Sequence, residues 1–296
     1  MSVDFIGIGT MRSGTSWIAM NLRAHPQICV SEPKEIRYFN RYLTSRGIGR
    51  RELNPNYDEG LDWYLKHFKH ARKGQVVGEY SPSYLYDDHA AIAIKRCFPD
   101  IKLIACLRNP VDRAYSHYRM WRGNATLGNI SFEEALEQDE IYVGMGHYAK
   151  QLKAYLDHFE RDQILILIFE ELIRCPEHTI PKIFRFLDVS PELPLDYAGM
   201  DKNPAAHIRS TRMMKTAVSA SRFLINARLS FVLNALRELG AHSLFTKINK
   251  PPLRYPPMTK ETSQRLMEIF SEDISELERL LERDLKEWRD HVRQGA

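Results

Sequence analysis

The chain has 296 residues, of which 44% are hydrophobic and 27% charged, and its formal net charge is +4. This apolar content is enough for one large domain or two small ones, so a mainly disordered protein is excluded. No apolar run approaches the about 18 residues of a membrane-spanning helix. The start of the chain lacks the basic head and apolar stretch of a signal peptide, and the four cysteines stand singly. We therefore expect a soluble, cytoplasmic protein without a disulfide framework.

The predicted elements alternate between strands and helices. Residues 4–9 form a short apolar run with glycines, and an amphipathic stretch follows over residues 14–25, which predicts a strand, a tight turn and a helix. Three further predicted strands are apolar on both faces, at 76–79, 101–107 and 164–169. Helical patterns separate them at 61–68, 87–98, 110–121, 132–137, 148–159 and 176–187. The expected fold class is α/β, with a P-loop-type parallel sheet flanked by helices and a helical C-terminal portion.

The C-terminal third has a different character. A proline-containing connection leads to a long basic and apolar helix, or helix pair, over residues 213–239. A second proline-rich loop, 250–257, precedes an amphipathic helix over 260–291. We expect one domain over residues 1–296, with a core at 4–190 and a helical acceptor, lid and C-terminal portion at 200–292.

Positive charge is concentrated in one segment. Residues 202–260 hold eleven Lys or Arg and one acid, a local charge of +10. Such a segment contacts an anionic partner or forms a solvated basic face. Within it, arginines lie among the apolar residues of 213–239, a pattern typical of a core helix with an exposed edge, of a peripheral membrane contact, or of a site for an amphiphilic acceptor.

The turn after the first strand has the features of an anion cradle. Gly9 and Gly14 are five residues apart at a strand-to-helix turn, where backbone N–H groups and the helix N-terminus favour an oxyanion. The glycine spacing matches a Walker A loop, but Thr15 stands where that loop has lysine, and Arg12 is the only cation of the turn. The sequence therefore predicts an anion site that is not a standard nucleoside-triphosphate loop.

Two other functions remain open on the residues alone. A P-loop kinase or NTPase would need an acid to hold magnesium, and Glu170 and Glu171 could supply it, although the strand at 101–107 ends in Arg108. A non-catalytic polyanion-binding protein would use the basic segment 202–260.

Several segments resemble one enzyme family. Arg-Ser-Gly-Thr-Ser-Trp at 12–17 resembles the 5′-phosphosulfate loop of sulfotransferases that use 3′-phosphoadenosine 5′-phosphosulfate. Residues 107–118 resemble the family's 3′-phosphate signature, a strand ending in Arg with Ser eight residues later. Segments 33–40, 60–64 and 254–256 resemble the branch that sulfates carbohydrates such as heparan sulfate.

The resemblance implies sulfuryl transfer by in-line displacement, without a metal, to a hydroxyl or amine. The implied acceptor is a carbohydrate or an amphiphilic small molecule, and no nucleic acid partner is expected. Trp17 is expected either to stack on adenine or to pack in the core. The donor-binding residues that the resemblance implies are Arg12, Ser13, Gly14, Thr15, Ser16, Trp17, Arg108, Ser116, Arg254 and Tyr255.

The catalytic residues implied are Arg12, for charge on the leaving oxygen, and Glu35, as general base. Partial burial is expected to raise the pKa of Glu35 toward neutrality. Its alternative role is a surface ion pair with Lys34 or Arg37, and Glu79 is the second candidate base. Many relatives have Lys where this chain has Tyr80.

Three histidines and one C-terminal loop are also considered for the site. His25, His117 and His147 fall in helical patterns and are expected to be structural. The segment 251–253 reads Pro-Pro-Leu where the family has Lys-Gly-Arg, so Lys250 or Arg254 would have to supply the charge there.

Overall fold

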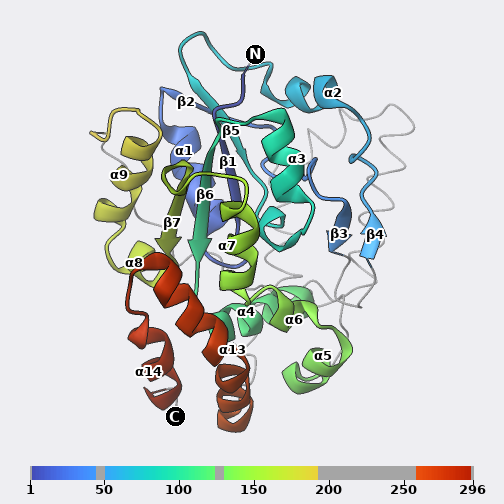
Figure 1. Ribbon diagram of the computed structural model, residues 1–296, viewed down its shortest axis with the longest axis vertical. Helices are drawn as coiled ribbons and strands as arrows, with labels where there is room; N and C mark the ends of the chain where they lie inside the picture. The colour runs from blue at the N-terminus through green and yellow to red at the C-terminus, as the bar shows by residue number, and fades with distance from the viewer. Residues whose placement is uncertain (1, 45–50, 124–129, 193–257, 295–296) are drawn as a thin grey trace, which may run out of the picture.

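The computed structural model describes residues 2–44, 51–123, 130–192 and 258–294. Within this part of the chain, five parallel strands form one sheet in the order β2-β5-β1-β6-β7 (Figure 1). The predicted α/β fold with a parallel sheet is confirmed. The strands of this sheet are β1 (Phe5–Gly9), β2 (Ile28–Val30), β5 (Val76–Tyr80), β6 (Lys102–Leu107) and β7 (Ile164–Ile168).

Helices cover both faces of the sheet. One apolar cluster joins β1 and β6 to α1, α8 and α9, and the other joins the opposite faces of these strands to α3, α4, α7 and α13 (Figure 1). A separate hairpin, β3 (Tyr42–Thr44) and β4 (Arg51–Leu53), pairs antiparallel. The helices that precede residue 190 are α1 (Thr15–Ala24), α2 (Leu61–Leu65), α3 (Ala90–Cys97), α4 (Pro110–Gly123), α5 (Phe132–Gln138), α6 (Ile141–Gly144), α7 (Tyr148–Leu156), α8 (Phe169–Arg174) and α9 (Pro176–Phe186), with 3₁₀ turns η1 (Lys66–Phe68), η2 (Tyr84–Tyr86) and η3 (Arg161–Gln163).

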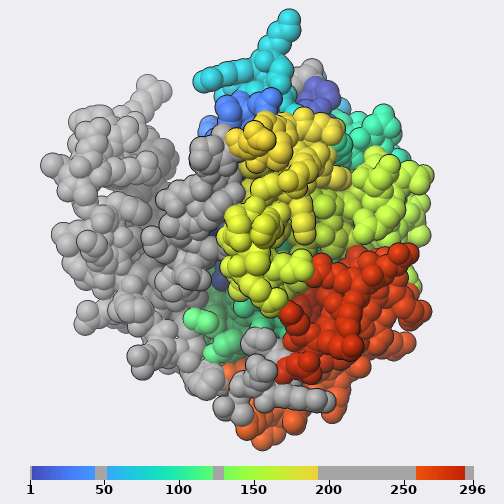
Figure 2. Space-filling model, turned by 90° about the vertical axis from the view of Figure 1, so that its left-hand side faces the viewer, coloured from blue at the N-terminus to red at the C-terminus, as the bar shows by residue number. Residues whose placement is uncertain are grey.

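The C-terminal amphipathic segment is two helices, not the single helix that its periodicity predicts. Helix α13 (Lys260–Leu281) ends at Glu282, which has a left-handed φ of 51°, and α14 (Lys286–Gln294) follows. The Glu278 carboxylate accepts a hydrogen bond from the Leu285 amide at 2.8 Å and so fixes the turn. Leu285 and Trp288 remain buried beyond the break, which explains why the apolar spacing continues through it. Figure 2 shows these helices in red below the yellow segment that contains α9.

A close approach between two strands makes one glycine essential to the sheet. Gly78 of β5 pairs with Phe5 of β1, and a Cβ at Gly78 would lie 2.4 Å from both the ring and the carbonyl oxygen of Phe5. The carbonyl belongs to the backbone of β1 and cannot rotate away. We expect Gly78→Ala to lower the free energy of unfolding by about 1–3 kcal/mol through overpacking. Urea denaturation monitored by tryptophan fluorescence measures this, and an unchanged midpoint would contradict it.

Several sequence predictions lie outside the described residues. These are the helix at 213–239, the basic segment as a whole and the loop with Arg254 and Tyr255, so the single-domain division stays a prediction. None of the described helices is both long enough and apolar enough to cross a membrane. Because the strands are parallel, their carboxyl ends meet at one edge of the sheet, where ligand sites of open α/β sheets lie.

Candidate active site

The turn between β1 and α1 has the backbone of an anion cradle. Gly14 adopts φ 74°, a left-handed conformation that glycine accepts readily, and begins α1. A Cβ at this position would lie 3.1 Å from the Phe169 ring, so the turn is also closely packed. Ser13 is fully buried, and its hydroxyl has no hydrogen-bond partner among the described residues. A buried, unpartnered hydroxyl beside a helix N-terminus is suited to donate to an oxyanion.

The structure brings the two predicted phosphate motifs into direct contact. The Arg12 Nε donates to Ser116 Oγ at 3.1 Å, and an Arg108 terminal nitrogen donates to the Arg12 carbonyl oxygen at 3.2 Å. The Arg108 guanidinium lies 4.7 Å from the centre of the Phe169 ring, a cation–π distance. Tyr148 donates its hydroxyl to the Arg108 carbonyl oxygen at 2.8 Å. Residues nearly a hundred positions apart thus form one cationic site at the ends of β1 and β6.

Two further arginines, which the sequence analysis missed, add charge to this site. Burial and the positive charges of Arg108, Arg119 and Arg113 lower the pKa of Arg12 to about 10. Arg113 is fully buried and donates to the Tyr142 carbonyl oxygen. Arg113 and Arg119 both lie on α4, and Arg119 is one turn beyond Ser116. Helical spacing was therefore the signal that could have found them. Such a concentration of like charge is stabilised by a bound polyanion.

The other predicted donor-site residues are distributed over α1. Thr15 is buried and Ser16 is exposed, and both lie in the first turn of the helix. Trp17 is 7% exposed and belongs to the apolar cluster of the α1 and α9 face, which favours the core interpretation over adenine stacking.

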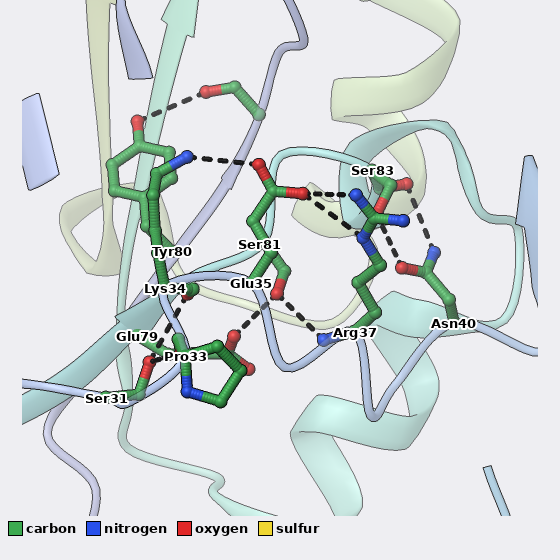
Figure 3. Close-up of polar contacts among 11 residues, drawn as sticks. Ser31, Pro33, Lys34, Glu35, Arg37, Asn40, Glu79, Tyr80, Ser81 and Ser83 are labelled. Atoms are coloured by element: carbon green, nitrogen blue, oxygen red, sulfur yellow. Dashed lines mark hydrogen bonds and ion pairs between the residues drawn. The ribbon is translucent and has the colours of Figure 1, made fainter. Parts of the chain in front are cut away.

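Glu35 lies in the segment between β2 and β3, held by cations on both carboxylate oxygens. Lys34 Nζ contacts Oε1 at 3.1 Å, and the Arg37 guanidinium contacts Oε2 at 3.1 and 2.5 Å (Figure 3). Burial alone would raise the pKa of Glu35, but the two cations outweigh burial and lower it. The expected rise toward neutrality is therefore wrong, because both neighbouring cations turn toward the carboxylate. The alternative ion pair is present, and the side chain keeps 27% of its surface exposed.

Glu79, at the end of β5, has the environment that was expected for Glu35. It is fully buried, and burial raises its pKa to about 7 despite hydrogen bonds that favour the charged form. Tyr64 and Tyr84 donate to Oε1 at 3.1 and 2.7 Å, and Ser81 donates to Oε2 at 2.6 Å. A carboxylate so enclosed has no path to an acceptor in this conformation.

Tyr80 connects the Glu35 cluster to the anion turn. Its ring is fully buried, and its hydroxyl donates to the Gly9 carbonyl oxygen at 3.2 Å (Figure 3). Lys34 Nζ lies 5.8 Å from the centre of this ring while it contacts Glu35. Tyr80 is thus a packing residue at a position where relatives were expected to carry lysine, and Lys34 supplies a cation beside it.

The histidines take structural roles in the described part of the chain. His117 is fully buried, and burial together with Arg113 and Arg12 lowers its pKa well below the ordinary value. It accepts a hydrogen bond from the Trp121 indole at 2.8 Å. His25 contacts the Ser190 carbonyl oxygen at 2.9 Å.

The acids considered for a magnesium site are engaged elsewhere. Glu170 accepts from the Asn109 amide at 2.9 Å and from the Trp288 indole at 3.1 Å, which fixes α14 beside the turn after β6. Glu171 pairs with Arg283. In the described ranges no three His, Cys, Asp or Glu residues gather as a metal site would require.

The raised pKa of Glu79 predicts a pH-dependent stability. The folded protein binds a proton at this carboxyl group up to about pH 7, whereas the unfolded chain releases it near the ordinary glutamate pKa of 4.5. This contribution to stability is therefore complete below pH 4.5 and is lost as the pH rises through 7. We expect the stability difference between wild type and Glu79→Gln to fall by about 2–4 kcal/mol from pH 4.5 to pH 8. Urea denaturation of both proteins across this range measures it, and a constant difference would contradict the shift.

Comparison with known proteins shows which family the chain is similar to. The family model described as "Sulfotransferase domain" matches residues 3–220. Kil1 of Dictyostelium discoideum, a membrane-associated sulfotransferase, is 33% identical over 144 residues, which cover 46% of this chain and 28% of that protein. Human heparan sulfate glucosamine 3-O-sulfotransferase 3B1 is 29% identical over 190 residues, covering 61% and 44%. The matched region is thus less than half of each relative's length.

A solved structure extends the likeness over the whole chain. The crystal structure of a sulfotransferase from Alicyclobacillus acidocaldarius is 26% identical and superposes with a TM-score of 0.68, covering 98% of this chain and 99% of that one. With the family match over more than half of the chain, the conclusion is direct: this chain is a member of the sulfotransferase domain family.

Proposed function

We propose that the enzyme transfers a sulfuryl group from 3′-phosphoadenosine 5′-phosphosulfate to an acceptor hydroxyl or amine. The observation that carries this proposal is the contact of Arg12 with Ser116 and Arg108, which unites two anion-binding turns. A donor with phosphate groups at both its 3′ and 5′ ends needs two such turns close together. The unpartnered Ser13 hydroxyl and the positive charges gathered around Arg12 fit an anionic nucleotide.

Each turn has a distinct role in this proposal. The turn at residues 9–15 holds the 5′-phosphosulfate through backbone N–H groups and the hydroxyls of Ser13 and Thr15. Arg108 and Ser116 hold the 3′-phosphate, and the planar guanidinium of Arg108 suits a two-pronged contact. Arg12 lies between the two and donates to the oxygen that bridges phosphorus and sulfur.

Transfer exchanges one S–O bond for another S–O bond, or for an S–N bond when the acceptor is an amine. The acceptor atom forms its bond to sulfur as the bond to the bridging oxygen breaks, and that oxygen keeps the electron pair as a phosphate oxygen of the released 3′,5′-ADP. Glu35 takes the acceptor proton. Its low pKa keeps it ionised at neutral pH, and Lys34 and Arg37 hold its orientation.

The acceptor class is proposed as a carbohydrate or an amphiphilic small molecule. The similarity to human heparan sulfate glucosamine 3-O-sulfotransferase 3B1, whose name gives a carbohydrate substrate, supports the first. The word "membrane-associated" in the Dictyostelium name supports testing lipid acceptors and anionic vesicles as well. The cytoplasmic location stays a prediction.

Two measurements on the wild-type protein test the function. We expect 3′,5′-ADP to raise the melting temperature in the presence of EDTA, and the ³⁵S-labelled donor to label at least one member of a panel of desulfated heparan oligosaccharides, glycolipids and phenols. Protection only by ATP with magnesium would favour an NTPase. Salt-sensitive binding of heparin without transfer to any acceptor would favour a polyanion-binding protein.

A further inference from the structure

The segment that carries Glu35 has no regular secondary structure of its own. Residues 31–40 connect β2 to the β3–β4 hairpin without helix or strand hydrogen bonds. Buried backbone N–H groups of such a segment need other partners. Three of these groups, at Ile36, Arg37 and Phe39, are directed to the carboxyl end of β5 and the turn that follows it.

Glu79 is the common end point of these three contacts. The Ile36 amide interacts with the Glu79 carboxylate and favours its charged form, which lowers the pKa of Glu79. The Arg37 amide donates to Ser81 Oγ at 3.0 Å, and that hydroxyl donates to Glu79 Oε2 at 2.6 Å (Figure 3).

A tyrosine provides the third connection. The Phe39 amide donates to the Tyr84 hydroxyl at 3.4 Å, and this hydroxyl donates to Glu79 Oε1 at 2.7 Å. Tyr64 donates to the same oxygen at 3.1 Å. Among the described residues, its hydroxyl accepts no hydrogen bond from a backbone amide of residues 31–40, so it differs from Tyr84 in this respect. Above about pH 7, where Glu79 is ionised, its carboxylate can accept from these three hydroxyls and from the Ile36 amide, whereas an amide side chain would direct its own N–H donors at them.

The backbone fixed in this way determines where the side chain of Arg37 lies. Arg37 has φ 57°, a conformation that costs a non-glycine residue energy and needs support from its surroundings. The Arg37 amide is held by Ser81, while its guanidinium holds Glu35 Oε2. The buried network and the exposed ion pair therefore meet in one residue.

We propose that Glu79 is a positioning residue for Glu35, acting by gathering the amides of residues 36, 37 and 39 onto one buried carboxylate. Its catalytic consequence rests on the proposed function of Glu35 as base. Glu79 itself touches neither donor nor acceptor, because its side chain is fully enclosed.

Amide hydrogen exchange tests the anchor without any assay of activity. At pH 8, where Glu79 is ionised, we expect Glu79→Gln to speed exchange at Ile36, Arg37 and Phe39 by roughly tenfold or more, because hydrogen bonds to a charged group are lost. The pair Tyr84→Phe and Tyr64→Phe is the matched control, since each removes one hydroxyl from Oε1 and keeps its ring. Only Tyr84→Phe should speed exchange at Phe39. Equal exchange in these two variants would overturn the anchor, even if Glu79→Gln fails to fold.

Measurements of turnover test the catalytic consequence of the proposal. They use the ³⁵S-labelled donor and an acceptor from the panel that the wild-type protein labels. We expect Glu79→Gln to lower kcat by roughly 10- to 100-fold, with protection by 3′,5′-ADP and the donor KM within about threefold of wild type. Tyr84→Phe should lower kcat more than Tyr64→Phe, a difference that Glu79 acting as the base would not produce. Faster exchange with unchanged kcat would overturn the positioning role. If the wild type labels no acceptor, the proposed function fails, and the exchange data still decide whether Glu79 anchors the segment.

Discussion

Glu35→Gln should lower the rate of sulfuryl transfer by about 10²–10⁴-fold, the usual contribution of a general base. The substitution keeps the shape of the side chain and removes its ability to take the acceptor proton. Donor binding should be spared, because the contacts of Glu35 are with Lys34 and Arg37 and not with the turn that holds the donor. Single-turnover transfer from labelled donor measures the first effect, and thermal protection by 3′,5′-ADP measures the second.

A matched control for this variant lies on α13. Glu276→Gln removes an acid that is also paired with two cations, Lys153 and Arg279, and whose side chain is half-buried like that of Glu35. Its transfer rate should stay near wild type. Wild-type activity in Glu35→Gln would refute the assignment of Glu35 as the general base.

Arg12→Ala should reduce kcat by about 10²–10³-fold, since a donor aimed at developing charge contributes most in the transition state. Because the same guanidinium lies against Ser116, protection by 3′,5′-ADP should weaken as well. Arg108→Ala should weaken this protection and reduce kcat less, because Arg108 is proposed to hold the 3′-phosphate, remote from the bond that breaks. Melting curves and turnover of both variants measure the separation.

Arg174→Ala is the charge-matched control for both arginines. Arg174 lies on α8 in an exposed ion pair with Glu287, and exposed pairs of this kind contribute little to stability. The account would be contradicted if Arg12→Ala bound 3′,5′-ADP and turned over like Arg174→Ala.

Local patterns predicted the elements around the site well. The apolar runs that became β1, β5, β6 and β7 are covered on both faces, so their composition alone indicated a parallel sheet. The short edge strand β2 was missed because three residues carry no periodic signal. The break at Glu282 was missed because the apolar spacing continues into α14.

The chemistry of individual carboxylates could not be predicted in the same way. Both Glu35 and Glu79 stand near a strand end in the sequence, and both could have been the buried acid. Which one is buried depends on whether Lys34 and Arg37 turn toward Glu35 and whether Tyr64 and Tyr84 close over Glu79. These side-chain rotamers depend on tertiary packing, which the local sequence does not determine. The contributions of Arg113 and Arg119 likewise required the position of α4.

Two alternative functions, a kinase or NTPase and a polyanion-binding protein, were left open by the sequence. Glu170 and Glu171, the acids that a kinase would need, are used to fasten the C-terminal helices. Membership of the sulfotransferase domain family supports an enzyme and not a passive polyanion binder.

The turns carrying Arg12 and Arg108 are proposed to bind opposite ends of one nucleotide. A crystal structure of the protein with 3′,5′-ADP tests it most directly. The account predicts the 5′-phosphate in the turn at residues 9–15 and the 3′-phosphate on Arg108 and Ser116, with Arg12 between them. A nucleotide bound away from these turns, or one held by a single turn only, would contradict it.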